Sequence, residues 1–281
     1  MKVKHLVGAF LCVLGCYACS SPKTEVQSPD GHIKMTLTVD ENGKPFYNVS
    51  VDDSLLIENS AMGFTAANGI ILGEGFQVKN TTFSSEDETW TQPWGENKKN
   101  RNHYNEMAVN LTNEDHVQLT LRFRVFDDGI GFRYEYTVPT VDSLLITDEL
   151  TTFRFHRDGT SWSIPASAET YELLYQQQPI SEVETANTPF TFKTADGVYG
   201  SIHEAALYDF PEMTLKQIGH YTLKAELAPW PDGIKARKGN HFTTSWRTVQ
   251  IAPEAVGLIN SSLILNLNDP CVLELRTGFA R

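Results

Sequence analysis

Cysteine is scarce in this sequence, and the signature motifs of several large enzyme classes are missing. Three of the four cysteines lie within the first 19 residues, so we expect no disulfide framework. There is no Walker A loop, no HExxH zinc motif, no GxSxG nucleophile elbow and no dinucleotide fingerprint. These absences argue against nucleotide-dependent, zinc-peptidase and serine-hydrolase chemistry of the kinds those motifs support.

Clustered basic residues are also missing from the body of the chain. Acidic residues outnumber basic ones by 35 to 23, which gives a formal net charge of -12. Because nucleic-acid binding needs Lys and Arg gathered against phosphates, we expect no nucleic-acid partner. Hydrophobic residues make up 41% of the 281 residues, which is enough to build a sizeable core.

The N-terminus carries a targeting pattern. Two lysines precede the apolar run of residues 6–14, and small residues and cysteines follow, as in a bacterial secretory signal that is too short for a stable membrane span. We expect residues 1–19 to be a signal or lipoprotein segment, with lipid attached at Cys19 or alternatively at Cys16, and residues 20–28 to be a tether. The protein would then be exported, as a periplasmic or outer-membrane lipoprotein of a Gram-negative bacterium, touching the membrane only through this anchor.

The rest of the chain alternates apolar and polar residues with period two. Residues 33–39, 117–125 and 132–138 show the alternation clearly, and Asp127-Asp128-Gly129 is a turn between two of these runs. We expect further strands at residues 153–155, 190–193, 198–202, 221–227, 244–251 and 263–267, with Asp196-Gly197 as a hairpin turn.

Little helix is expected. The one helical candidate is residues 168–177, and the polar, Trp-bearing residues 90–104 read as a long ordered loop. Many strands separated by turn signals predict an all-β fold of two packed sheets over residues 23–270.

Six short sequence motifs in the rest of the chain resemble those of a known family. In order, they are Ser28-Pro29-Asp30-Gly31; Trp94-Gly95-Glu96 followed by Tyr104-Asn105-Glu106; the stretch from Phe123 through Asp127-Asp128-Gly129 to Tyr134; the stretch from Ile202-His203-Glu204-Ala205-Ala206-Leu207 to Phe210; Ser245-Trp246-Arg247-Thr248-Val249-Gln250-Ile251; and Leu265-Asn266-Leu267-Asn268-Asp269-Pro270. Together they resemble the N-terminal domain of glycoside hydrolase family 97, over most of the mature chain.

The resemblance implies an architecture and an activity. Family members are exported enzymes acting on α-glucosides or α-galactosides, with an N-terminal β-super-sandwich of the galactose-mutarotase-like kind, a catalytic (β/α)8 barrel and a small C-terminal β domain. It places the sandwich at residues 29–272 and leaves residues 273–281 as an aberrant tail, like that of a truncated or frame-shifted product. The barrel, which carries both catalytic carboxyls in the family, is absent from this sequence, so we expect no catalytic residue here.

The resemblance also implies a metal ligand. In the inverting branch of the family, the Glu of the His-Glu-Ala-Ala-Leu motif binds calcium, and the corresponding residue here is Glu204. Calcium prefers six to eight oxygen ligands, so Glu204 could bind it tightly only with the missing barrel. The alternative for Glu204 is a strand-end carboxylate paired with an Arg. Adjacent strand residues face opposite ways, so His203 would not join Glu204 on one ion.

Other residues have two interpretations. Trp94 and Glu96, with Trp90, could bind sugar by stacking and hydrogen bonding, or could pin an ordered loop. Asp127 and Asp128 are better explained as turn residues than as a catalytic pair. Strand arginines such as Arg124, Arg133 and Arg247 are expected to form ion pairs or to stack on aromatic rings.

The sequence thus predicts a carbohydrate-associated accessory domain of an α-glycosidase, contributing to the active-site wall and one calcium ligand. Its expected partners are α-glucoside or α-galactoside oligosaccharides and a family 97 barrel. The alternatives are a stand-alone carbohydrate-binding lipoprotein and a structural or interaction domain with a large exposed apolar face.

Overall fold

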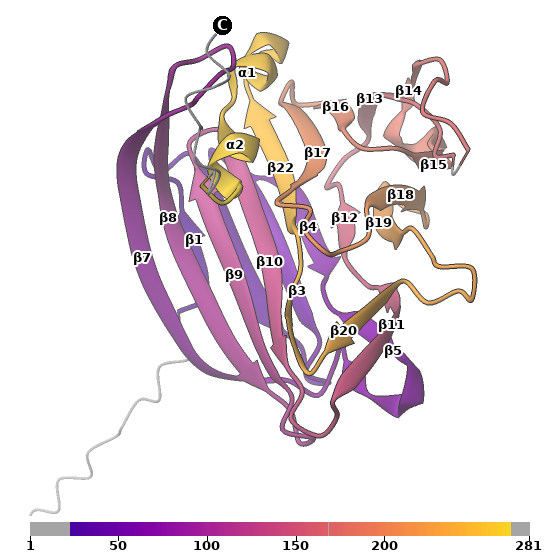
Figure 1. Ribbon diagram of the computed structural model, residues 1–281. Coiled ribbons are helices and arrows are strands. Elements are labelled where there is room, and N and C mark those ends of the chain that lie inside the picture. The colour runs from indigo at the N-terminus through magenta and orange to yellow at the C-terminus, as the bar shows by residue number, and fades with distance from the viewer. Residues whose placement is uncertain (1–22, 168, 271–281) are drawn as a thin grey trace, which may run out of the picture.

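A computed structural model describes residues 23–167 and 169–270 of the chain. The expected lipid sites Cys19 and Cys16, and the tail of residues 273–281, lie outside the described residues, as does most of the signal and tether region. Strands dominate the described part, and only two short α-helices occur in it (Figure 1).

One layer of the molecule is a single ten-stranded antiparallel sheet. Its strand β7 forms one edge and β14 the other (Figure 1). Its order is β14 (Gln176–Pro179), β13 (Gly159–Ser163), β16 (Phe190–Thr194), β17 (Tyr199–Ala205), β22 (Trp246–Ala252), β10 (Gly129–Thr137), β9 (Gln118–Phe126), β8 (Lys99–Thr112) and β7 (Gln77–Thr91), with β21 (His241–Thr243) beside β10.

The other layer consists of three four-stranded sheets. The first is β1 (Glu25–Gln27), β2 (Ile33–Val39), β3 (Pro45–Val51) and β4 (Ser54–Ala61); the second is β20 (Ala236–Gly239), β11 (Ser143–Glu149), β5 (Phe64–Ala66) and β6 (Ile71–Leu72); the third is β12 (Thr152–Arg154), β19 (Thr222–Leu227), β18 (Met213–Gln217) and β15 (Thr185–Ala186). Short 3₁₀ turns occupy Ala67–Gly69 and Ile180–Glu182.

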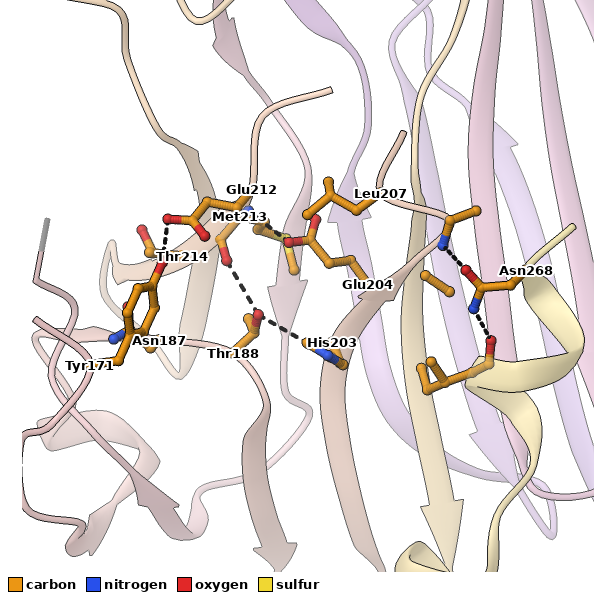
Figure 2. A pocket seen from close by; sticks show the side chains of 13 residues that line it. Tyr171, Asn187, Thr188, His203, Glu204, Leu207, Glu212, Met213, Thr214 and Asn268 are labelled. Carbon is orange, nitrogen blue, oxygen red and sulfur yellow. Dashed lines mark hydrogen bonds between the residues drawn. The ribbon is translucent and has the colours of Figure 1, made fainter. Parts of the chain in front are cut away.

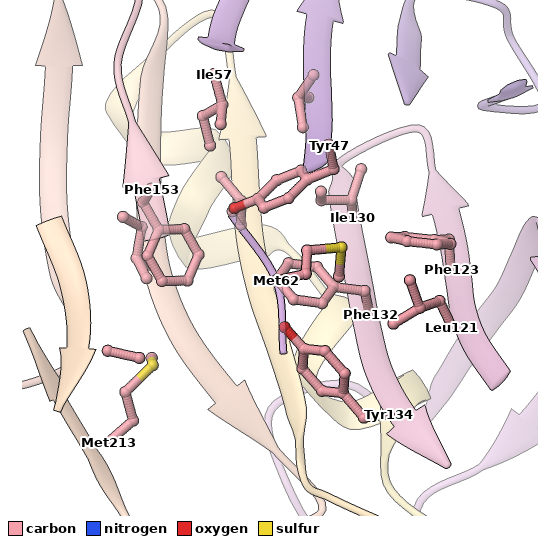
Figure 3. Packing of buried hydrophobic residues seen from close by; sticks show 14 of the residues in the cluster. Tyr47, Ile57, Met62, Leu121, Phe123, Ile130, Phe132, Tyr134, Phe153 and Met213 are labelled. Atoms are coloured by element: carbon pink, nitrogen blue, oxygen red, sulfur yellow. The ribbon is translucent and has the colours of Figure 1, made fainter. Parts of the chain in front are cut away.

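Aromatic residues on the inner face of β10 hold the two layers together. Phe132 lies 4.9 Å from Tyr47 of β3 and 6.5 Å from Phe153 of β12, measured between ring centroids. Tyr134 contacts Phe64 of β5 at 4.9 Å. Figure 3 shows Phe132 and Tyr134 in this packing with Tyr47 and Phe153. With the Phe64 contact added, one strand packs against all three smaller sheets. The expected all-β sandwich is confirmed, with its second layer divided into three.

The turn between β9 and β10 is formed as expected. Its Gly129 has φ +141°, and a Cβ there would lie 2.2 Å from the Val249 carbonyl oxygen, so both backbone and packing require glycine. The side chain of Asp127 accepts the Asp30 N–H, and that of Asp128 accepts the Ser261 hydroxyl. Both aspartates occupy the turn, as predicted, and their side chains also anchor neighbouring segments, which the sequence did not predict.

Two expectations about helix and strand are wrong. Residues 263–267 form the helix α2 (Leu263–Leu267), not a strand. Its Leu263 and Leu267, four residues apart, pack on the outer face of the large sheet in a cluster with Trp246. An alternating Leu pattern is compatible with a strand or with a short helix. The helix forms here because the apolar patch on the outer face of the sheet binds Leu263 and Leu267.

Residues 168–177 were expected to be helical, but no helix occurs among the described residues of this stretch, which leads into β14. Leu173, Leu174 and Tyr175 are exposed. A short helix without an apolar surface to pack against is not stable in water, which explains the difference.

The expectation of a long loop at residues 90–104 is also wrong. Strand β7 runs to Thr91 and β8 begins at Lys99, so only residues 92–98 connect them. Most β7 side chains are exposed, so its sequence lacks the alternation of apolar and polar residues. The strand is stabilised instead by backbone hydrogen bonds to β8.

Helix α2 is tied to this hairpin. The Trp90 indole donates to the Asn266 side chain at 2.8 Å, and Asn266 donates to the Arg101 carbonyl at 2.8 Å. The other helix, α1 (Ala255–Asn260), follows β22 (Figure 1). Over the residues described, no helix is long and apolar enough to span a membrane.

Candidate functional site

Glu204 lies near the end of β17, where it is nearly buried. Its Oε2 accepts a hydrogen bond from Arg247 Nη1 at 2.6 Å, and its Oε1 accepts the Met213 backbone N–H at 3.0 Å. The pairing with Arg247 is the alternative that the sequence left open for this residue. Burial raises the pKa of Glu204 above its usual value, and the charge of Arg247 opposes that rise.

Arg247 is shared between two carboxylates. Its Nε and Nη2 donate to the two oxygens of Glu149 at 2.9 and 2.6 Å, and its Nη1 also donates to the Ser245 hydroxyl at 2.8 Å. The side chains of Arg247, Glu149 and Glu204 are 1%, 0% and 5% exposed. Three strands, β11, β17 and β22, thus bring a buried Glu149–Arg247–Glu204 triad together.

Sequence analysis missed Glu149, and the reason is a β-bulge. Leu144 and Ile146 of β11 are buried in alternation, which would place Asp148 on the inside. The register of β11 against β5 shifts between Ile146 and Asp148, so Glu149 is the buried residue instead. Period-two reasoning cannot see such an insertion, because one extra residue exchanges the two faces of the strand.

A cavity of about 310 Å³ opens beside Glu204. Figure 2 shows Glu204, His203 and Thr188 on neighbouring segments around it, with Tyr171 and Glu212 on the opposite side. The Tyr171 hydroxyl donates to the Glu212 carboxylate at 2.5 Å. The wall is completed by Asn187, Ala205, Ala206, Leu207, Met213, Thr214, Ile264 and Asn268.

Asn187 brings an unsatisfied polar group to this cavity. The residue is only 3% exposed, and neither its side-chain oxygen nor its nitrogen has a hydrogen-bond partner. Buried amides without partners are uncommon in folded proteins. His203, in contrast, lies 3.1 Å from the Thr188 hydroxyl, and burial lowers the pKa of its ring. His203 and Glu204 therefore have different partners.

The predicted sugar-binding residues lie elsewhere. Trp94 is 78% exposed on the connection between β7 and β8, and Glu96 is exposed on the same connection. Neither residue lines the cavity beside Glu204. Trp90 lies near the end of strand β7, not in a loop, and its indole is bonded to Asn266 of α2.

All three strand arginines named above form cation–π contacts, as predicted for this group; Arg247 lies 5.7 Å from the Phe210 ring, and the other two lie on the outer face of the large sheet. Arg124 lies over the Tyr104 ring at 4.5 Å and over the Trp246 ring at 5.0 Å, and Arg133 lies 4.6 Å from the Trp246 ring. These contacts, together with their ion pairs to Glu106 and Glu135, stabilise the outer face of the large sheet.

Residues 26–270 match the family model described as Glycosyl-hydrolase 97 N-terminal. The chain belongs to this family. Its similarity to a glycoside hydrolase family 97 enzyme from Pseudoalteromonas sp. strain K8, solved with acarbose and with panose, has a TM-score of 0.84 at 39% identity. That match covers 88% of this chain and 38% of the enzyme.

Two more distant matches cover a similar part of the chain. A retaining α-galactosidase from Bacteroides thetaiotaomicron is 25% identical over 246 residues, which is 82% of this chain and 36% of the enzyme. A β-arabinopyranosidase structure shares the fold with a TM-score of 0.74 at 20% identity, covering 82% of this chain and 40% of that one. This family 97 chain thus spans well under half the length of these relatives, and it corresponds to the N-terminal domain of the family.

Proposed function

We propose that this chain is the carbohydrate-associated accessory domain of an exported α-glycosidase and does not catalyse hydrolysis alone. In this proposal it forms part of the active-site wall and supplies Glu204 as one calcium ligand. The observation that carries the proposal is the placement of the Glu204 carboxylate at a polar cavity in a family 97 N-terminal domain.

The cavity offers donors suited to calcium. Glu204 and Glu212 are carboxylates, and the Asn187 side-chain oxygen has no partner, so the available groups are the hard oxygens that calcium prefers. Within residues 23–167 and 169–270, no three His, Cys, Asp or Glu side chains come close enough together to hold a metal ion. Glu204 would therefore hold calcium together with ligands from a catalytic barrel. Bound calcium would supply positive charge and Lewis acidity to the active-site wall.

The same side of the molecule offers a surface for that barrel. Leu207 and Tyr208 are exposed next to the cavity, and Tyr171 is exposed at its rim. Asn268, near the end of the matched region, accepts the Ala206 N–H at 3.0 Å and lines the cavity. The relatives continue well beyond the length matched here, so a chain leaving Asn268 would start at this surface. Exposed apolar groups gathered in this way are typical of an interaction site.

The test is reconstitution. The full chain is mixed with the catalytic region of the Pseudoalteromonas enzyme, and hydrolysis of nitrophenyl α-glucoside and α-galactoside is followed with calcium and with a chelator. We expect no turnover by the chain alone and calcium-dependent turnover by the pair, because glycosidic cleavage needs two suitably placed carboxyl groups.

Variants sharpen this test. Glu204→Gln should lower the activity of the pair by at least about tenfold, since changing even an outer-shell partner of a metal ligand typically costs about 10–100-fold in metal affinity or activity. Glu106→Gln is a matched control: Glu106 is also a nearly buried carboxylate paired with arginine, but it is not part of the cavity wall. Turnover by the isolated chain, or equal activity of the Glu204→Gln and wild-type pairs, would refute the proposal.

The exposure of Trp94 favours a second candidate, a stand-alone carbohydrate-binding lipoprotein. An aromatic ring held out on a short connection between long strands can stack on a sugar. Binding by the isolated chain that depends on Trp94 would support this candidate.

A further inference from the structure

The buried triad contains two carboxylates and one guanidinium. With all three groups ionised, it carries one excess negative charge. Both oxygens of Glu149 are occupied by Arg247, and Glu149 has no exposed surface. Neither water nor a counterion can therefore reach the excess charge at the Glu149 end of the triad.

Only the Glu204 end of the triad reaches the cavity. Glu204 is part of the cavity wall, whereas Glu149 and Arg247 are not. Glu204 receives one hydrogen bond on each oxygen, which leaves the other lone pairs of both oxygens free. The unpartnered oxygen of Asn187 and the carboxylate of Glu212 border the same cavity. The excess charge is thus presented where two further oxygen donors are available.

Glu149 also controls the orientation of Arg247. A guanidinium binds a carboxylate best through two parallel N–H groups, and Arg247 uses its Nε and Nη2 in this way on Glu149. Glu204 is left with the single contact from Nη1. Without the Glu149 carboxylate, Arg247 could donate both of its parallel N–H groups to Glu204. The two residues would then form an ion pair of zero net charge in which both Glu204 oxygens are covered.

We propose that Glu149 is a positioning residue: by holding the two parallel N–H groups of Arg247, it leaves the Glu204 carboxylate accessible to a multivalent cation in the cavity. This rests on the proposed function in assigning Glu204 to a metal. Glu149 acts entirely through Arg247 and touches neither the cavity nor the cation.

The experiment is a terbium titration of the full chain, with emission sensitised by excitation of the cavity tyrosine Tyr171. Because the barrel ligands are missing, we expect weak binding by the wild type, seen as emission that saturates only at high terbium concentration and that calcium displaces, and loss of the signal in Glu204→Gln. Glu149→Gln should weaken terbium binding by about threefold to tenfold, because one buried charge is removed near a multivalent ion. Glu106→Gln, which removes the same charge from a nearly buried ion pair outside the cavity, should change it by less than about twofold.

Two more variants separate positioning from folding. Glu149→Asp keeps the charge, so it should restore most of the affinity lost in Glu149→Gln, even where Glu149→Gln itself folds poorly. In a Glu204→Gln background, Glu149→Gln should cause no further loss. Circular dichroism confirms the fold of each variant before titration.

The inference is overturned by wild-type affinity in a folded Glu149→Gln, by an equal loss in Glu106→Gln, or by wild-type chain that gives no saturable signal. The outcome is distinct from that of the reconstitution. A titration that behaves as expected while the pair stays inactive refutes the proposed function alone. Calcium-dependent activity of the pair with an unaltered Glu149→Gln titration refutes only the positioning role.

Discussion

Replacing Arg247 by Met removes the cation from the triad and leaves two buried carboxylates facing each other. Removing one partner of a buried ion pair typically costs about 3–5 kcal/mol. Arg247 serves both Glu149 and Glu204, whose side chains are 0% and 5% exposed, so we expect the upper end, about 5 kcal/mol. For a domain of this size each kcal/mol lowers the melting temperature by about 2–4 °C, which predicts a loss of about 10–20 °C.

The loss should depend on pH in a defined direction. Buried carboxylates without a cation favour the protonated form, so the native state of Arg247→Met binds more protons than its unfolded state. Stability then falls as pH rises, and the deficit against wild type should be large at pH 8 and smaller at pH 4.5. Thermal unfolding followed by circular dichroism at both pH values measures this.

A matched variant tests the cause. Adding Glu149→Met and Glu204→Met to Arg247→Met replaces the triad by apolar side chains, which should recover most of the lost stability. A melting-temperature loss below about 3 °C in the single variant, or an equal loss at both pH values, would show that the triad is not the buried charge network described here.

Three further predictions follow from other parts of the chain. Leu263→Ala should lower the free energy of unfolding by about 3 kcal/mol in a denaturant titration, because this fully buried side chain anchors α2 to the sheet; a loss under about 1 kcal/mol would contradict that packing. Calorimetry with millimolar maltooligosaccharides should give heat that disappears in Trp94→Ala if the stand-alone binding candidate is right, and no heat from the wild type removes that candidate. Labelling with a palmitate analogue should be lost on Cys19→Ala, or on Cys16→Ala if that residue is the anchor; label that survives loss of both cysteines refutes the lipoprotein expectation.

Period-two alternation was sufficient to predict most of the fold. Strands such as β2 and β9, and β10 from Phe132 onward, bury every second residue along most of their length, so their sequences carry the pattern of a half-buried sheet. Strand β7 carries no such pattern, because it is an edge strand with mostly exposed side chains. Its structure depends on a hydrogen-bonded partner, and single-sequence patterning does not record that.

The candidate site was predicted only in part. Glu204 was predicted from a sequence motif of the family, and its pairing with an arginine was one of the alternatives for that residue. Glu149 and Asn187 could not be found, since the first depends on a bulge in β11 and the second on a cavity assembled from distant segments. Residues of this kind become visible only when the tertiary contacts are known.

The attachment of α2 also has a mechanical consequence. Asn268 is bonded to Ala206 on one side and to the Ile264 carbonyl on the other, while Asn266 ties α2 to Trp90 and β8. Tension applied to the chain beyond Asn268 would therefore load these side-chain bonds and the leucine contacts of α2 first. The long ladders of the ten-stranded sheet would be shielded from that force, so α2 should yield before any strand is peeled away.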